Sequence, residues 1–245
     1  ETLFTFTGAL TSATLDNETV YSNQPIIVNA GSKLTFNAPA NGARIYLAVH
    51  GGFKSKKGRL QKNDFLLTAQ SFNYHFEGVG QLHALTTGWT ANTGEFYRSN
   101  IIRCIQGPNF NVLSKKEIEQ FENKQFEIDL QSNRMGFRLK SDPICHTITP
   151  ELLSTAVTRG TLQLTPAGQL IVLMADHQTT GGYPRIGTVI GADMASLAQM
   201  PIGSSFGIKW IDIQEAERLL LQQETNLQQL ENACKFRLQE YFSEK

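Results

Sequence analysis

The first third of the chain is divided into short strand-like stretches by turn-forming residues, and this spacing constrains the fold more than any other feature. Phe4 and Phe6 alternate with Thr5 and Thr7, the period of two that is typical of a β-strand. Further strands are expected at Val20–Ser22, Pro25–Val28, Lys33–Phe36, Arg44–Val49 and Phe65–Leu67. Asn41-Gly42 suits a type I′ hairpin turn. Short strands at such intervals favour a barrel or a sandwich.

The second half of the chain has a similar spacing and adds two short helices. Strands are expected at 101–108, Phe126–Leu130, Thr161–Leu164, Leu170–Met174, Thr188–Ile190 and Ser205–Trp210. Ser114 and Glu117 have the spacing of a capping box, which predicts a helix through about Asn123. Asp193 is expected to cap a second helix that ends near Gln199.

A long amphipathic helix is expected at the C-terminal end of the sequence. Residues 213–242 contain no glycine or proline, and apolar residues recur at roughly helical spacing. These residues are Ile213, Ala216, Leu220, Leu227, Leu230 and Phe236. The helix either packs against its own domain or binds a partner. The sequence thus predicts two β units, at 1–95 and 96–212, and a C-terminal helix over 213–245. We place the join of the two units within 77–98.

Composition narrows the class of protein. The 245 residues are 40% hydrophobic and 18% charged, as in a soluble globular protein. Basic and acidic residues number 22 each, so the net charge does not favour nucleic-acid binding. No apolar run approaches the ~20 residues of a membrane span. The three cysteines show no CxxC spacing and predict neither a disulfide framework nor a zinc site, so we expect a reducing cytoplasm.

One connection, residues 175–187, carries far more chemistry than a turn requires. It follows the apolar run Leu170–Met174 and contains a carboxylate, an imidazole, an amide, two hydroxyls, a phenol and a guanidinium. Gly181 and Gly182 lie among them and permit a close approach to the backbone. A polar hairpin loop with satisfied side chains is the alternative. We interpret the connection as a binding site.

The residue types in this connection favour a planar amide or carboxylate ligand. An arginine fork and glycine backbone donors can hold such a group, and Asp176 or His177 can move protons near neutral pH. Arg134 and Arg138 occupy a second polar stretch, where surface ion pairing is the alternative role. The five histidines never have the spacing of a metal-binding helix, so no metal site is expected. The sequence has no GxSxG nucleophile elbow and no phosphate loop.

Three stretches of the sequence form a recognisable set: 132–139 (SNRMGFRL), 160–173 (GTLQLTPAGQLIVL) and 176–186 (DHQTTGGYPRI). Together they resemble the biotin-dependent carboxyltransferase-like family, whose members include the C subunit of 5-oxoprolinase, the antagonist of the Kip kinase inhibitor and the carboxyltransferase domain of urea carboxylase. Residues 42–53, 106–108 and 193–199 add supporting matches. The resemblance covers nearly the whole sequence.

The resemblance implies a mainly β fold of two cyclophilin-like β-barrel units in tandem, with short helices and a long C-terminal α-helix. It implies a subunit that works with 5-oxoprolinase A-like and B-like subunits to hydrolyse 5-oxo-L-proline to L-glutamate at the expense of ATP. The predicted catalytic residues are Asp176, His177 and Tyr183. The predicted substrate-binding residues are Arg134, Met135, Gln178, Thr179, Thr180, Gly181, Gly182, Arg185, Gly51 and Gly52.

Two other functions remain open under the same resemblance. The chain can be a non-catalytic antagonist of a Kip-inhibitor-like protein, which is related to the B-like subunit. It can also be the carboxyl-acceptor half of a biotin-dependent urea or amide carboxylase, like allophanate hydrolase subunit 2. Because no Met-Lys-Met biotinylation sequence occurs, biotin would come from another protein. No cofactor is expected to bind this chain itself, whereas ATP is used by the complex. The expected ligand is a small lactam or amide.

The sequence departs from the family in two places. Family members open with a segment that contains a Thr-Val-Gln-Asp-like run, and nothing before Glu1 supplies it. They also carry a Gly-Ser-Arg-rich loop after Gly-Gly-Phe, whereas Phe53 leads almost directly into residues 56–59 (KKGR). We expect both segments to be missing from the printed sequence through truncation or disorder, and an intact mass above 27.3 kDa would agree with this.

Overall fold

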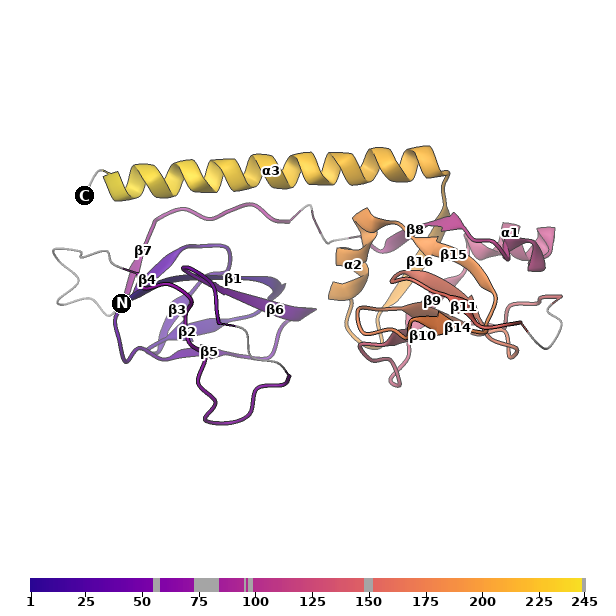
Figure 1. Ribbon diagram of the computed structural model, residues 1–245, viewed down its shortest axis with the longest axis horizontal. Helices are drawn as coiled ribbons and strands as arrows, with labels where there is room; N and C mark the ends of the chain where they lie inside the picture. The colour runs from indigo at the N-terminus through magenta and orange to yellow at the C-terminus, as the bar shows by residue number, and fades with distance from the viewer. Residues whose placement is uncertain (55–57, 73–83, 95, 97–98, 148–151, 244–245) are drawn as a thin grey trace. The chain divides into compact units, whose positions relative to one another are not determined.

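The chain forms two compact units, seen in the computed structural model of Figure 1. The structure describes residues 1–54, 58–72, 84–94, 96, 99–147 and 152–243. One unit comprises Glu1–Thr93 with Gln228–Lys245, and the other comprises Gly94–Leu227. Much of the expected join, at 77–83, 95, 97 and 98, lies outside the described residues, as do residues 55–57 of the second departure from the family.

The first unit is built from two antiparallel sheets. Its described strands are β1 (Thr2–Leu10), β2 (Ala13–Leu15), β3 (Glu18–Val20), β4 (Ile26–Val28), β5 (Leu34–Phe36), β6 (Asn41–Val49) and β7 (Ala84–Thr86). One sheet has the order β6-β1-β4-β7 and the other has the order β3-β2-β5. Phe6 and Ile26 are fully buried in the core of this unit, together with Ala13. The described residues of this unit thus form two sheets, without the closed barrel expected for it.

Two expectations for the first unit are wrong. Type I′ geometry needs positive φ at both central residues, and between β2 and β3 Asp16 (φ 50°) and Asn17 (φ 74°) meet this requirement. Asn41 instead begins β6. Of the two residues in the predicted turn, Gly42 has a positive φ and Asn41 does not. Phe65–Leu67 does not form a strand: only one isolated bridge, Phe53 with Thr68, forms nearby among the described residues, and Phe65 is 89% exposed.

The second unit contains a closed seven-stranded barrel, drawn in magenta to orange in Figure 1. The barrel strands are β8 (Ile101–Gln106), β9 (Gln125–Ile128), β10 (Gly136–Lys140), β12 (Thr161–Leu164), β13 (Leu170–Leu173), β15 (Arg185–Val189) and β16 (Ser205–Trp210). Their order is β10-β13-β12-β15-β8-β16-β9, and β9 pairs with β10 to close the ring. The parallel pairing of β16 with β8 is the exception to an otherwise antiparallel barrel. A further pair, β11 (Thr155–Ala156) and β14 (Thr180–Gly181), lies outside it.

Large apolar side chains fill the barrel. Phe126, Phe206, Leu162 and Leu164 are each fully buried, as strand alternation requires of residues that face one interior. The turn between β12 and β13 is held by the Gly168 amide, which donates to the Thr165 carbonyl at 2.9 Å. This packed apolar core fixes the positions of the strand ends, from which the connections leave the barrel.

Short helices join the barrel strands. A 3-10 helix (Phe110–Val112) precedes α1 (Lys115–Phe121), and the Ser114 hydroxyl accepts the Glu117 amide at 3.2 Å, as the capping box predicts. A second 3-10 helix (Gly191–Asp193) runs into α2 (Met194–Gln199). Asp193 makes no capping bond, so the capping role predicted for it is wrong.

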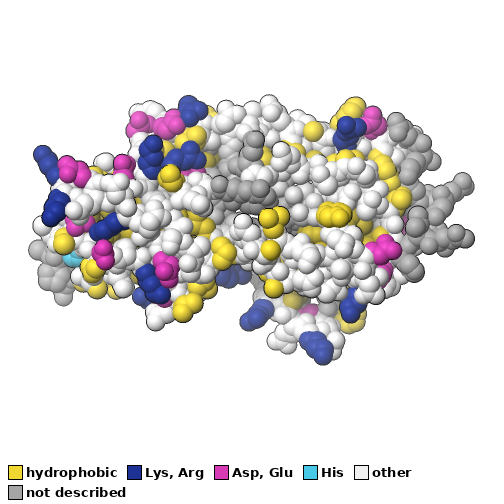
Figure 2. Space-filling view, turned by 180° about the vertical axis from the view of Figure 1, so that it is seen from behind, with side chains coloured by type: hydrophobic (Ala, Val, Ile, Leu, Met, Phe, Trp, Pro, Cys, Tyr) yellow, Lys and Arg dark blue, Asp and Glu magenta, His cyan; other side chains and the backbone are white. Residues whose placement is uncertain are grey.

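The C-terminal helix α3 (Ile213–Ser243) forms as predicted, and none of its side chains is fully buried. Its residues up to Leu227 belong to the barrel unit and those from Gln228 belong to the first unit. Gln223 donates to the Ala192 carbonyl at 2.9 Å, which fixes the first half of α3 beside α2. Among the described residues, no helix is long and apolar enough to span a bilayer. On the face shown in Figure 2, basic and acidic side chains lie interspersed.

Candidate functional site

The strand order of the barrel determines where the residue 175–187 connection runs. This connection, which we call the signature segment, joins β13 to β15. Both strands are neighbours of β12, one on each side, so the signature segment must cross over β12. The polar residues it carries therefore gather on the outside of the barrel, above one buried strand.

Arg134 and Met135 meet the start of the signature segment. The Arg134 carbonyl accepts the Asp176 amide at 2.9 Å, and the Met135 carbonyl accepts the Met174 amide at 3.0 Å. The Arg134 guanidinium also holds the Asp176 carboxylate, with Nε 2.8 Å from Oδ2 and Nη2 3.2 Å from Oδ1. The two polar stretches singled out in the sequence thus form one surface. This ion pair is well exposed, so it contributes little to stability and leaves both groups within reach of a ligand.

The middle of the signature segment presents its polar groups to solvent. His177 Nδ1 lies 2.6 Å from the Gln178 carbonyl oxygen, which fixes the ring against its own backbone. Gln178 and Thr179 are exposed, while the Thr179 carbonyl accepts the Val157 amide at 3.1 Å. The backbone is therefore anchored here, and the exposed side chains can face a ligand.

The glycine pair lies at the point where the signature segment pairs with another strand. In β14, Thr180 pairs with Ala156 and Gly181 pairs with Thr155 of β11. A Cβ on Gly182 would make only ordinary contacts, at 3.4 Å from the Leu152 carbonyl oxygen and 3.5 Å from the Ser154 hydroxyl. Tyr183 follows with 44% of its side chain exposed. This edge gives a ligand access to backbone and phenol together.

Arg185 holds the strand pair β11 and β14 against the barrel. Arg185 Nη1 donates to the Ala156 carbonyl at 2.9 Å, and the Arg185 backbone amide donates to Asn109 Oδ1 at 3.0 Å.

Gly51 and Gly52 belong to the first unit, where they form a turn with φ of 71° and 76° after β6. A Cβ on Gly51 would lie 2.5 Å from the Gln70 Cβ, so the turn needs a glycine there. Packing alone thus accounts for Gly51.

Sequence reasoning missed Gln163 on β12, directly beneath the signature segment. Its side chain is 1% exposed and its Nε2 has no hydrogen-bond partner. A glutamine between Leu162 and Leu164, in a strand whose four residues are all buried, was missed because Leu-Gln-Leu has the alternation of an ordinary half-exposed strand.

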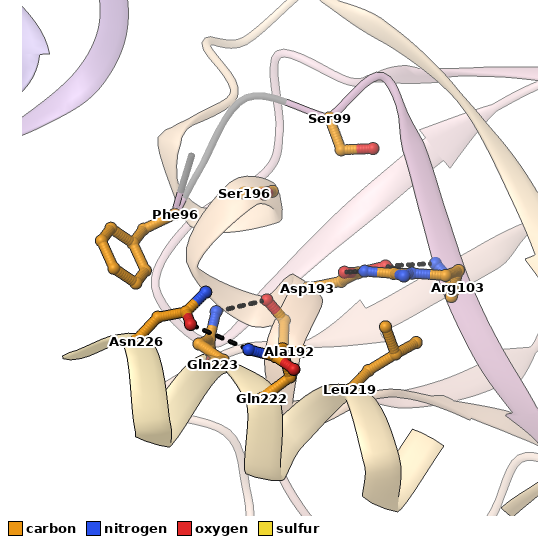
Figure 3. Close-up of a pocket in the computed structure, with 10 residues that line it drawn as sticks. All are labelled: Phe96, Ser99, Arg103, Ala192, Asp193, Ser196, Leu219, Gln222, Gln223 and Asn226. Atoms are coloured by element: carbon orange, nitrogen blue, oxygen red, sulfur yellow. Dashed lines mark hydrogen bonds and ion pairs between the residues drawn. The ribbon is translucent and has the colours of Figure 1, made fainter. Parts of the chain in front are cut away.

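A second polar site lies in the barrel unit (Figure 3), in a cavity of about 220 Å³. It is lined by residues of β8, the 3-10 helix Gly191–Asp193, α2 and α3, together with Phe96 and Ser99. Arg103 and Asp193 point toward one another, and Asp193 Oδ2 accepts the Arg103 amide at 2.7 Å and Nε at 3.0 Å. The hydrogen bond to Asp193 raises the pKa of Arg103 above its usual value. Because the two charges compensate each other, the pair serves primarily to join β8 to the 3-10 helix that leads into α2. Across the described residues, no cluster of three or more histidine, cysteine or acidic side chains could hold a metal ion.

Comparison with known proteins agrees with the fold and the family resemblance. The chain is 34% identical over 245 residues to the C subunit of 5-oxoprolinase of Escherichia coli (strain K12), covering 93% of this chain and 75% of the relative. It is 30% identical over 246 residues to the C subunit of 5-oxoprolinase of Haemophilus influenzae (strain ATCC 51907 / DSM 11121 / KW20 / Rd), with the same coverage of 93% and 75%. A third relative, urea amidolyase of Lachancea kluyveri, is 22% identical over 269 residues and matches 95% of this chain and 14% of its own length.

Solved structures share the fold. Urea amidolyase of K. lactis superposes with a TM-score of 0.79 at 19% identity, over 94% of this chain and 16% of that protein. Urea carboxylase of Kluyveromyces lactis gives 0.76 at 20% identity, over 94% and 23%. The chain thus spans less than a quarter of those two longer proteins. The family described as carboxyltransferase domain, subdomain A and B, matches residues 1–58 and 56–210. Its fold, its sequence and these relatives show that the chain belongs to the carboxyltransferase domain, subdomain A and B, family.

Proposed function

We propose that this chain is the C subunit of a 5-oxoprolinase-type complex, which acts with A-like and B-like subunits in the ATP-dependent hydrolysis of 5-oxo-L-proline to L-glutamate. The observation that carries the proposal is the identity of 34% and 30% to two proteins named as the C subunit of 5-oxoprolinase, each over 93% of this chain. The word subunit in those names supports an assembly of several chains.

The signature segment has the chemistry that a lactam requires. A lactam is planar and offers one carbonyl acceptor and one N–H donor. The β14 edge offers backbone groups beside Gly182, and the exposed Arg134 guanidinium can bind the carboxylate of 5-oxoproline if its pairing with Asp176 loosens. Asp176, His177 and Tyr183 are the groups proposed to move the proton when water adds across the lactam C–N bond.

Substitution of two signature residues tests this role in the assembled complex. Tyr183→Ala and Thr180→Ala are expected to lower 5-oxoproline-dependent ATP hydrolysis by about 10²-fold, because each removes a polar group that faces the proposed substrate. Tyr21→Ala is the matched control, since Tyr21 is 66% exposed and belongs to the first unit. Activity is measured after mixing each variant with purified A-like and B-like subunits. Unchanged activity in both signature variants would contradict the assignment.

Carboxyl transfer to urea or another amide is the second candidate, favoured by the match of 95% of this chain to urea amidolyase. Under this function a biotin carboxylase and a biotin carrier would supply the carboxyl group, and incorporation of labelled bicarbonate into urea would report it. An antagonist role would give tight binding to a B-like subunit with neither activity. The three functions are therefore separated by measuring both reactions and binding on the same preparation.

A further inference from the structure

Gln163 is a buried polar residue on the outer wall of the barrel. Its neighbours Leu162 and Leu164 face the apolar interior, so strand alternation directs Gln163 outward. Yet its side chain is only 1% exposed, because the signature segment crosses above it. A polar side chain that is fully covered needs a hydrogen-bond partner, so a glutamine is an unfavourable choice here if packing is its only role.

The cover over Gln163 is Gly181 and the short strand pair around it. A Cβ at Gly181 would come closer to Gln163 Nε2 than real Cβ atoms approach other atoms, so the amide fills the space that the glycine leaves. Gln163 pairs in register with Arg185, and the β12–β15 register shifts between Leu162 and Gln163. Such irregularities redirect side chains and recur beside functional sites. The amide is thus aimed at the glycine edge of the signature segment.

The Gln163 amide nitrogen has no acceptor in this arrangement. Buried donors are almost always paired, and leaving one unpaired costs the desolvation of the group. The cover itself is slight, because β11 and β14 share only two residue pairs. Two hydrogen bonds reinforce it: the Val157 amide to the Thr179 carbonyl at 3.1 Å and Arg185 Nη1 to the Ala156 carbonyl at 2.9 Å.

We propose that Gln163 is a specificity-determining residue whose Nε2–H donates to the carbonyl oxygen of a planar amide substrate, which it reaches when β14 separates from β11. The proposal rests on the proposed function for the location of the site, and it adds the group that selects the substrate. An uncharged donor suits an uncharged carbonyl oxygen. A ligand without that oxygen leaves the donor buried and unpaired, which is the basis of strong discrimination by hydrogen bonding.

Nuclear magnetic resonance of the side-chain amide tests the contact directly. The Gln163 ¹⁵N–H₂ resonances are assigned by their loss in Gln163→Met, and the labelled full chain is titrated alone and with unlabelled A-like and B-like subunits. The probes are 5-oxo-L-proline, urea and L-proline, which has the same ring and carboxylate without the lactam carbonyl. We expect saturable shifts with an amide probe and none with L-proline.

Two variants separate binding from folding. Gln163→Met removes the unpaired donor while keeping the volume, so its melting temperature is expected to equal or exceed that of the wild type while amide affinity falls about tenfold. Gln169→Met is the control, since Gln169 is exposed on the adjoining turn. In the active complex, the KM for 5-oxoproline should rise by a similar factor.

The outcomes distinguish this inference from the proposed function. Shifts with urea but not with 5-oxoproline support the role of Gln163 and contradict the 5-oxoprolinase assignment. An absence of shifts with both amides, with and without partners, overturns the inference, and so does wild-type affinity in Gln163→Met.

Discussion

Replacing Arg103 by methionine is expected to lower the free energy of unfolding of the barrel unit by about 3–5 kcal/mol. Asp193 is 2% exposed, and Arg103 supplies the cation that compensates its charge. Methionine keeps most of the apolar stem but leaves the carboxylate buried without a counter-ion. The Arg103 amide, which also donates to Asp193, remains and is insufficient by itself.

Two further variants test whether the loss of stability comes from the unpaired buried carboxylate. Asp193→Asn leaves Arg103, whose side chain is 32% exposed and can reach water, so the loss should be smaller than in Arg103→Met. Arg103→Met combined with Asp193→Leu removes both charges and should recover most of the stability. Urea unfolding is followed through Trp210, in a Trp89→Phe background so that only the barrel unit reports. A double variant as unstable as Arg103→Met would show that the pair does not act through its charges.

The second large effect is expected at Gly187, the last residue of the signature segment and the middle residue of β15. A Cβ there would lie 2.5 Å from Trp210 Cζ3 and 2.9 Å from the Ile105 carbonyl oxygen. Neither atom can yield easily, because the indole packs against Phe110 at a centroid distance of 4.8 Å and the carbonyl belongs to β8. Gly187→Ala is therefore expected to cost about 1–3 kcal/mol or more in stability, by overpacking.

Gly207→Ala is the matched control for this substitution. Gly207 lies in β16 of the same barrel, and its Cβ would meet Gln125 Nε2 at 3.6 Å and Ile101 Cγ1 at 3.9 Å, which are ordinary contacts. Trp210→Phe removes the indole atoms that crowd Gly187, so it should partly rescue Gly187→Ala in a double-mutant cycle. Circular dichroism in urea gives the stability of the wild type, the three single variants and the double variant. Equal stability of Gly187→Ala and Gly207→Ala would contradict the packing argument.

Local patterns were sufficient to predict the strands and helices that depend on neighbours in sequence. β12 and β16 occupy the residue ranges expected from their apolar content, and α3 begins at the predicted Ile213. The Ser114 cap was also predictable, since its partner Glu117 is three residues away. These features follow from alternation, helical periodicity and capping, which operate over a few residues.

Long-range pairing could not be predicted in the same way. Asp193 has the sequence context of a helix cap, yet its carboxylate binds Arg103, 90 residues earlier in the chain. Phe65–Leu67 has the composition of a strand, but no named strand pairs with it among the described residues. The residues adjacent to a position in the sequence do not reveal a partner that is distant in sequence and comes close only in the folded chain.

The sequence singled out several residues of the candidate site, but it could not show which segment lies over which strand. Arg134 and Asp176 were selected as polar residues in separate stretches, and the structure joins them through a backbone hydrogen bond of 2.9 Å and an ion pair. Gln163 was not selected, because only the crossing of the signature segment over β12 shows that an outward side chain is covered. The strand order, rather than composition, contains this information.

Formation of L-glutamate from 5-oxo-L-proline, with ATP and purified A-like and B-like subunits, tests the central claim most directly. The reaction is run with this chain, without it, and with the Tyr183→Ala variant. We predict glutamate formation that depends on both ATP and this chain, and that is nearly lost with the variant. Glutamate formed equally well without the chain, or no glutamate from a complex that assembles fully, would contradict the assignment as a 5-oxoprolinase C subunit.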